Sequence, residues 1–131
     1  MRHPRDYSVN EAWIVFRLNG APIETEQGGD FNVTCLMDAA SCYILGSELV
    51  TSDVACVPMA AAERLIETGR AQANVLPTTL LLSSECDLSE FAEFAMSVGI
   101  YAERVPDDEL SAFVSEAREG FRKHLGIGRV Q

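Results

Sequence analysis

The second half of the sequence alternates short apolar runs with helical patterns, and this alternation restricts the fold more than any other feature. Residues 78–82 and 100–105 are predicted strands, and a helical pattern over residues 88–98 separates them. The run TTLLL at residues 78–82 is apolar on both faces, which is typical of a central strand covered on two sides. Strands joined through a helix lie parallel with right-handed crossovers, so this half predicts helices packed on a sheet.

The first half of the sequence consists of strand-like runs joined by turns. Residues 12–18 (AWIVFRL) are aromatic and β-branched, and the pair Asn19-Gly20 follows them as a turn signal. Residues 21–25 could then return as a short strand. Residues 31–37 alternate apolar with small polar side chains and form a predicted hairpin with residues 42–50. These strands precede every predicted helix.

Glycine, proline and acidic residues mark the expected bends and helix ends. Gly46 indicates a bulge or a close backbone approach within its strand. Pro58 can open a helix because the first turn needs no amide donor, and Gly69 is expected to end that helix. Asp87 and Glu90 form a capping-box pattern for the next helix.

A last helix follows residues 106–108, with one apolar side made of Leu110, Phe113, Val114, Ala117 and Phe121. The predicted element order is therefore β-β-β-α-β-α-β-α. It corresponds to an α/β fold with a mixed sheet of about five strands and helices packed on the sheet. We expect one domain over residues 12–126, a flexible N-terminal segment over residues 1–11 and a C-terminal tail over residues 127–131.

Charge and cysteine usage narrow the classes of partner and compartment. Twenty acidic against ten basic residues give a net charge of −10, which disfavours broad binding to nucleic acid or anionic membranes. No apolar run approaches the roughly 20 residues that span a bilayer, and the first ten residues lack a signal-peptide pattern. The four cysteines contain no CxxC pair, and neither His3 nor His124 lies at ligand spacing from them. We therefore expect a cytoplasmic protein with no bound cofactor.

Three stretches of sequence resemble a known family. Trp13 opens the first strand, the second strand runs into Met37-Asp38-Ala39-Ala40-Ser41, and the fourth leads into Leu82-Ser83-Ser84-Glu85-Cys86-Asp87 with Phe91 beyond it. These residues and the predicted element order resemble those of proteins with the ribonuclease H-like fold, including the catalytic cores of retroviral integrases and transposases. The likeness spans about residues 12 to 120.

The resemblance implies three carboxylates that converge on two divalent metal ions. In that family the first acid stands three residues after the tryptophan, where this chain has Phe16, which cannot coordinate magnesium. Glu85 matches the second position, and Glu116 or Glu119 the third. We therefore expect a non-catalytic domain that acts as a protein-binding or self-associating interaction module. The alternative is a divergent magnesium-dependent nuclease that uses Asp38, Glu85 and Glu116 or Glu119.

Two smaller features each have a functional and a structural interpretation. The acidic group Glu85, Asp87, Glu90 and Glu93 could bind a cation at the carboxyl edge of the sheet, or it could cap a helix and face solvent. Cys86 precedes a helix N-terminus that could lower the pKa of its thiol, or it could be a structural cysteine. A third function, mimicry of nucleic acid, would require the carboxylates to gather on one face.

Overall fold

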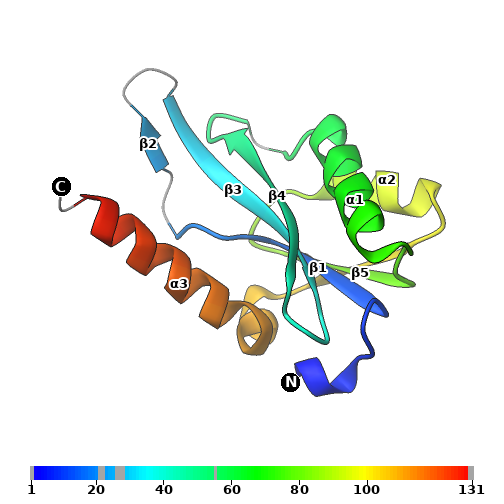
Figure 1. Ribbon diagram of the computed structural model, residues 1–131. Coiled ribbons are helices and arrows are strands. Elements are labelled where there is room, and N and C mark those ends of the chain that lie inside the picture. The colour runs from blue at the N-terminus through cyan, green and yellow to red at the C-terminus, as the bar shows by residue number, and fades with distance from the viewer. Residues whose placement is uncertain (1, 21–22, 26–28, 55, 130–131) are drawn as a thin grey trace.

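The computed structural model describes residues 2–20, 23–25, 29–54 and 56–129 (Figure 1). The strands are β1 (Ala12–Arg17), β2 (Ile23–Thr25), β3 (Gly29–Asp38), β4 (Ile44–Thr51), β5 (Thr79–Ser83) and β6 (Tyr101–Val105). The helices are α1 (Met59–Ala73), α2 (Ser89–Ser97) and α3 (Ser111–Arg129), with short 3-10 turns at Pro4–Asp6 and Asp107–Leu110. None of the described helices is both long and apolar enough to cross a lipid bilayer.

The six strands form one mixed sheet, which confirms the predicted α/β class. Moving across the sheet, β4 pairs with β3, β3 with β1, β1 with β5, and β5 with β6. β3 is antiparallel to β1 and β4, whereas β5 is parallel to β1 and β6 is parallel to β5. The sixth strand, β2, lies within residues 21–25, where the sequence allows a short returning strand. It pairs antiparallel with the start of β3, Ile23 opposite Phe31, and residues 21–22 of that expected strand lie outside the described residues.

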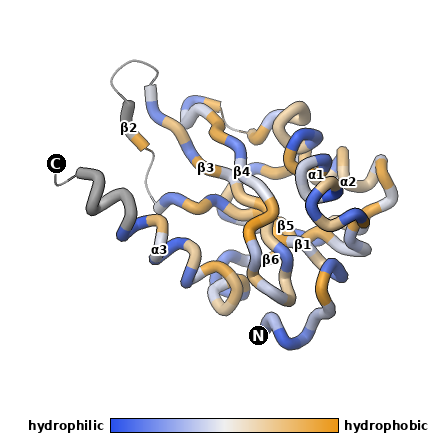
Figure 2. The backbone as a smooth tube through the Cα atoms, viewed as in Figure 1, coloured by the Kyte–Doolittle hydropathy of each residue, from blue (hydrophilic) through white to orange (hydrophobic). Residues whose placement is uncertain are grey.

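β1 is covered on both faces. All five residues from Ala12 to Phe16 are fully buried. Trp13 and Val15 belong to the core beneath α1 and α2, while Ile14 and Phe16 belong to the core beneath α3. The coloured part of α3 alternates hydrophilic and hydrophobic stretches, as expected of a helix with one buried side (Figure 2). Two helices on one face and one on the other therefore enclose an apolar sheet.

Two predicted helix ends differ from the structure. Gly69 does not end α1, which continues to Ala73 and is terminated by Asn74 in the left-handed conformation. Gly69 instead lies inside the helix and against the sheet. Asp87 and Glu90 do not form a capping box either, because the Glu90 carboxylate accepts from the Met59 amide, 3.1 Å away, at the start of α1. A tertiary contact has replaced the local one.

Gly46 satisfies both expectations for its strand. The pairing of β3 with β4 shifts register between Leu36 and Met37, directly opposite Gly46. A Cβ atom at position 46 would also lie 3.0 Å from the Thr68 Cγ2 atom of α1, so the strand and this helix approach closely there.

The segments on either side of the predicted domain are both part of the structure: the N-terminal segment contacts the domain, and the C-terminal segment extends its last helix. In the N-terminal segment, Arg2 forms an ion pair with Glu103 of β6, and the ring of Tyr7 lies 6.0 Å from that of Phe113. At the other end α3 continues to Arg129, so residues 127–129 of the expected tail are helical. Residues 130–131 lie outside the described part of the chain.

Replacement of Gly69 by alanine tests the close packing of α1 on the sheet. A Cβ atom there would lie 2.8 Å from both the Leu36 Cδ2 and the Trp13 Cζ3 atoms. We expect Gly69→Ala to lower the free energy of unfolding by about 1–3 kcal/mol despite the better helix propensity of alanine. The matched control is Gly120→Ala in α3, where nothing lies within 4 Å and a gain of up to about 1 kcal/mol is expected. Urea denaturation of both variants measures the contrast, and equal effects would contradict it.

Candidate functional site

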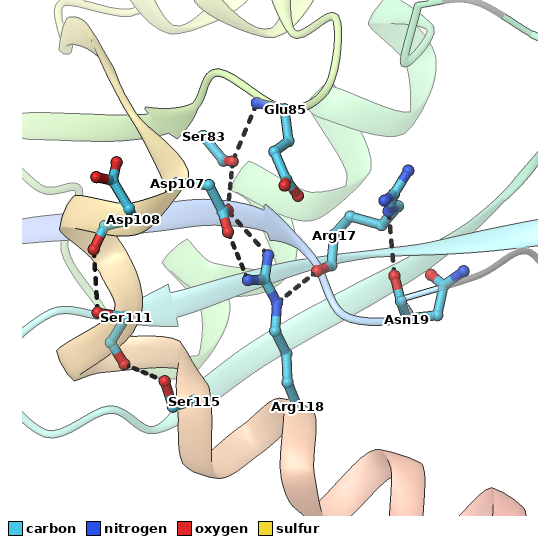
Figure 3. Close-up of polar contacts among 9 residues, drawn as sticks. All are labelled: Arg17, Asn19, Ser83, Glu85, Asp107, Asp108, Ser111, Ser115 and Arg118. Carbon is cyan, nitrogen blue, oxygen red and sulfur yellow. Dashed lines mark hydrogen bonds and ion pairs between the residues drawn. The ribbon is translucent and has the colours of Figure 1, made fainter.

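The carboxyl ends of β1, β5 and β6 meet at one edge of the sheet, where ligands of α/β proteins commonly bind. Arg17 ends β1, Ser83 ends β5, and Asp107 follows β6 in the 3-10 turn that leads into α3. Figure 3 shows these residues together with Arg118, which reaches up to them from α3. We call this edge the carboxyl edge, and it is the candidate functional site.

An ion pair between Asp107 and Arg118 closes the α3 side of this edge. The Arg118 Nη1 and Nη2 atoms donate to the two Asp107 carboxylate oxygens at 2.7 and 3.0 Å (Figure 3). The Ser83 hydroxyl donates to the same carboxylate at 2.7 Å, and the Arg118 Nε atom donates to the Arg17 carbonyl at 3.0 Å. The hydrogen bond from Arg118 is the main reason that the pKa of Asp107 is lowered. Both partners are thus held charged and engaged.

Phe16 lies directly beneath this ion pair. Its side chain is fully buried, and the Arg118 guanidinium carbon lies 5.4 Å from the ring centroid. That distance is within the range of a cation–π contact. The position where the resemblance requires an acid therefore carries an aromatic ring, packed in the α3 core and covered by a cation.

The acids named from the sequence are not brought together. Asp38 pairs with Trp13 near the start of β1, and Trp13 is level with Leu80 of β5. Glu85 lies beyond Ser83, the end of β5, so the strand from Leu80 to Ser83, about 10 Å long, separates the two acids. A metal site that uses both Asp38 and Glu85 is therefore incompatible with this strand register.

Each of these acids has other surroundings. The Asp38 carboxylate is buried and accepts from the amides of Asn10 and Ser41 at 2.7 and 2.8 Å, which fixes the turn before β4. Glu116 is exposed on α3, and Glu119 forms an ion pair with Arg122 one turn further along. Asp38, which the nuclease alternative uses as a metal ligand, thus has a structural role in this turn.

The acidic group at the start of α2 is also dispersed. Asp87 accepts from the Ser89 amide at 3.1 Å and from its hydroxyl at 2.7 Å, while Glu90 turns to α1. Across the described residues, no three His, Cys, Asp or Glu side chains are placed to hold one metal ion. Burial is the main reason that the pKa of the Cys86 thiol is raised, which favours the structural of the two interpretations.

Sequence reasoning missed the Asp107–Arg118 pair. Eleven residues along a continuous α-helix would separate the two side chains by about 16 Å. The pair forms because Asp107 lies in the 3-10 turn before α3, so the residue spacing alone does not predict it.

Comparison with known proteins supports the fold alone. No family model matches the sequence, and no curated protein is similar to it. Among solved structures, the chain is similar to one in the cryo-EM structure of the simian T-cell lymphotropic virus intasome in complex with PP2A regulatory subunit B56 gamma. The TM-score is 0.59 at 14% sequence identity. The match covers 88% of this chain but only 39% of that one.

Asp107→Asn tests whether the ion pair stabilises the carboxyl edge. Because the pKa of Asp107 is lowered in the folded state, its contribution is present above the unfolded pKa of about 4 and is lost as the pH falls through the folded value. At pH 7 we expect the variant to lose about 2 kcal/mol of the free energy of unfolding, with the difference from wild type narrowing in acid.

The measurement is urea denaturation at neutral and acid pH. Glu67→Gln, in an exposed pair with Arg70 on α1, serves as the control and should leave stability unchanged. A difference between wild type and Asp107→Asn that stays the same at both pH values would contradict the assignment.

Proposed function

We propose that the chain is a ribonuclease H-like domain without the two-metal site and that it acts as a protein-interaction module. The order of strands and helices and the fold-level similarity to a chain of the intasome–B56 gamma complex support the first part. One observation carries the proposal. At the carboxyl edge, the position where the resemblance requires an acid holds Phe16, and the Arg118–Asp107 pair covers it.

Electrostatics at this edge disfavour a divalent ion. A metal ion near Phe16 would lie close to the Arg118 guanidinium, and like charges a few ångströms apart repel strongly at low effective dielectric. The Asp107 carboxylate already uses both of its oxygens on Arg118. Glu85 remains exposed and has no ion pair with a described residue. One exposed carboxylate is too few ligands for a magnesium pair.

The outer edge of β4 is the proposed interaction surface. β4 pairs with β3 on one side, and none of the described strands pairs with its other side. Leu49 within β4 is 66% exposed and Tyr43 just before it is 59% exposed. An open strand edge with exposed apolar side chains favours addition of an extended segment from another protein. Since this chain carries a charge of −10, a basic segment is favoured over a second copy of the chain.

Site-specific photo-crosslinking tests this proposal. A photoreactive residue is placed at position 49 of β4 and, as the control, at position 96 of α2, where Met96 is 67% exposed. In an extract of the source cells, position 49 should give a discrete crosslinked product whose mapped peptide is basic and extended, because main-chain pairing holds it at the edge.

Position 96 should give no such product. Equal products from both positions, or a product that contains two copies of this chain, would contradict a basic partner at the β4 edge. The alternative function, a magnesium-dependent nuclease, requires instead that a divalent ion binds at the carboxyl edge.

A further inference from the structure

The α1 and α2 side of the carboxyl edge contains a hollow of about 240 Å³. Its polar lining consists mainly of Arg17, Asn32, Thr34, Ser52, Glu85 and Asp87, and Val50 and Val57 contribute apolar surface. β1 and β3 supply Arg17 and Thr34, which are paired across the sheet. The hollow therefore lies on the face opposite Phe16, while its Arg17 and Glu85 side chains stay within electrostatic reach of the Arg118–Asp107 pair.

Backbone pairing holds the rim of the hollow in place. The Val57 amide donates to the Asp87 carbonyl at 3.1 Å, and Cys56 forms a parallel bridge with Asp87. The segment that follows β4 is thereby joined to the segment that follows β5. Sites for small molecules are usually preformed in this way, which lowers the entropy lost on binding.

Several polar groups of the hollow have unused hydrogen-bonding capacity. Thr34 is only 3% exposed, lines the hollow, and its hydroxyl has no hydrogen-bond partner among the described residues. The Arg17 Nε atom donates to the Asn19 carbonyl at 3.1 Å, while its two terminal nitrogens have no described partner. The Asn32 Oδ1 atom accepts from the Asn19 side chain at 3.0 Å, which leaves the Asn32 amide group to donate. Thr34 is buried while Arg17 and Asn32 are half-buried, so the hollow presents accessible polar groups that a polar ligand or water can pair with.

The charges in the hollow select one ligand class. Arg17 provides one positive charge, and Glu85 and Asp87 provide two negative charges. A simple anion would meet both carboxylates, and a simple cation would meet the guanidinium. A molecule with one charge of each sign can satisfy both groups, and the paired donors of a guanidinium match a carboxylate. The volume is below the roughly 300–1,000 Å³ of sites for drug-sized ligands, so the molecule must be small.

We propose that this hollow binds an α-amino acid with an apolar side chain. The carboxylate of the ligand faces Arg17, Asn32 and Thr34, its ammonium group faces Glu85 and Asp87, and its side chain lies against Val50 and Val57. This proposal does not depend on the β4 surface, because that surface is argued from Tyr43 and Leu49, and neither of them lines the hollow.

Titration of the full chain with three probes tests the ligand class. L-leucine has both charges, its methyl ester lacks the carboxylate, and N-acetyl-L-leucine lacks the ammonium group. In amide-resolved NMR spectra we expect L-leucine to shift the signals of Arg17, Thr34 and Glu85 with a Kd of roughly millimolar or below. Each of the two derivatives should bind at least about tenfold more weakly, because each leaves one charged group of the hollow without a partner.

Two variants test the assigned residues against matched controls. Arg17→Gln should weaken L-leucine binding at least about tenfold, whereas Arg5→Gln at the exposed N-terminal turn should not change it. Glu85→Gln should weaken binding, and Glu93→Gln on the exposed side of α2 should leave it unchanged.

The three probes on the wild-type chain decide the proposal even if a variant fails to fold. Equal binding of the ester would mean a cation site, and equal binding of the N-acetyl compound would mean an anion site; either result overturns the proposal. Absence of shifts at Arg17, Thr34 and Glu85 with every probe overturns it as well.

Discussion

The burial of β1 on both faces is the constraint on which the rest of the structure depends. A strand whose residues 12 to 16 are fully buried needs an apolar layer above and below it, and α1 with α2 on one side and α3 on the other provide these layers. An ionised side chain on such a strand would cost several kcal/mol unless a partner compensated it. The metal-binding members of the resembled family supply metal ions as that compensation, whereas this chain has a phenylalanine at the position and stabilises the edge differently.

The carboxyl edge consequently has two unlike sides. Towards α3, Asp107, Arg118 and Ser83 use one another's hydrogen-bonding capacity, so this side is closed and contributes to stability. Towards α1 and α2, Arg17 and Thr34 keep donors without described partners around a small hollow. Strand alternation explains the difference, because Phe16 and Arg17 are neighbours whose side chains point to opposite faces. One strand end thus separates a structural ion pair from a proposed binding site.

Sequence patterns predicted those parts of the fold that depend on local periodicity. The strand at residues 78–82, the helix within residues 88–98 and the apolar side of α3 all follow from spacing and residue type. Contacts between distant segments were not predictable in this way. Gly69 would end an isolated helix, but here it allows α1 to approach Trp13, and Glu90 leaves its own helix to bind the Met59 amide. The candidate site was misjudged for the same reason, since its central pair joins two elements and Asp38 fixes a turn instead of a metal.

We propose that no divalent metal ion binds where Phe16 and Arg118 meet. Titration with Mn²⁺ tests it most directly, because this paramagnetic ion broadens the NMR signals of nearby amides. We expect only weak broadening of the signals near exposed carboxylates such as Asp53 and Glu93. The signals of Phe16, Glu85 and Asp107 should broaden no more than these. Selective, saturable broadening at these three residues, reduced in Glu85→Gln and accompanied by metal-dependent cleavage of nucleic acid, would contradict it.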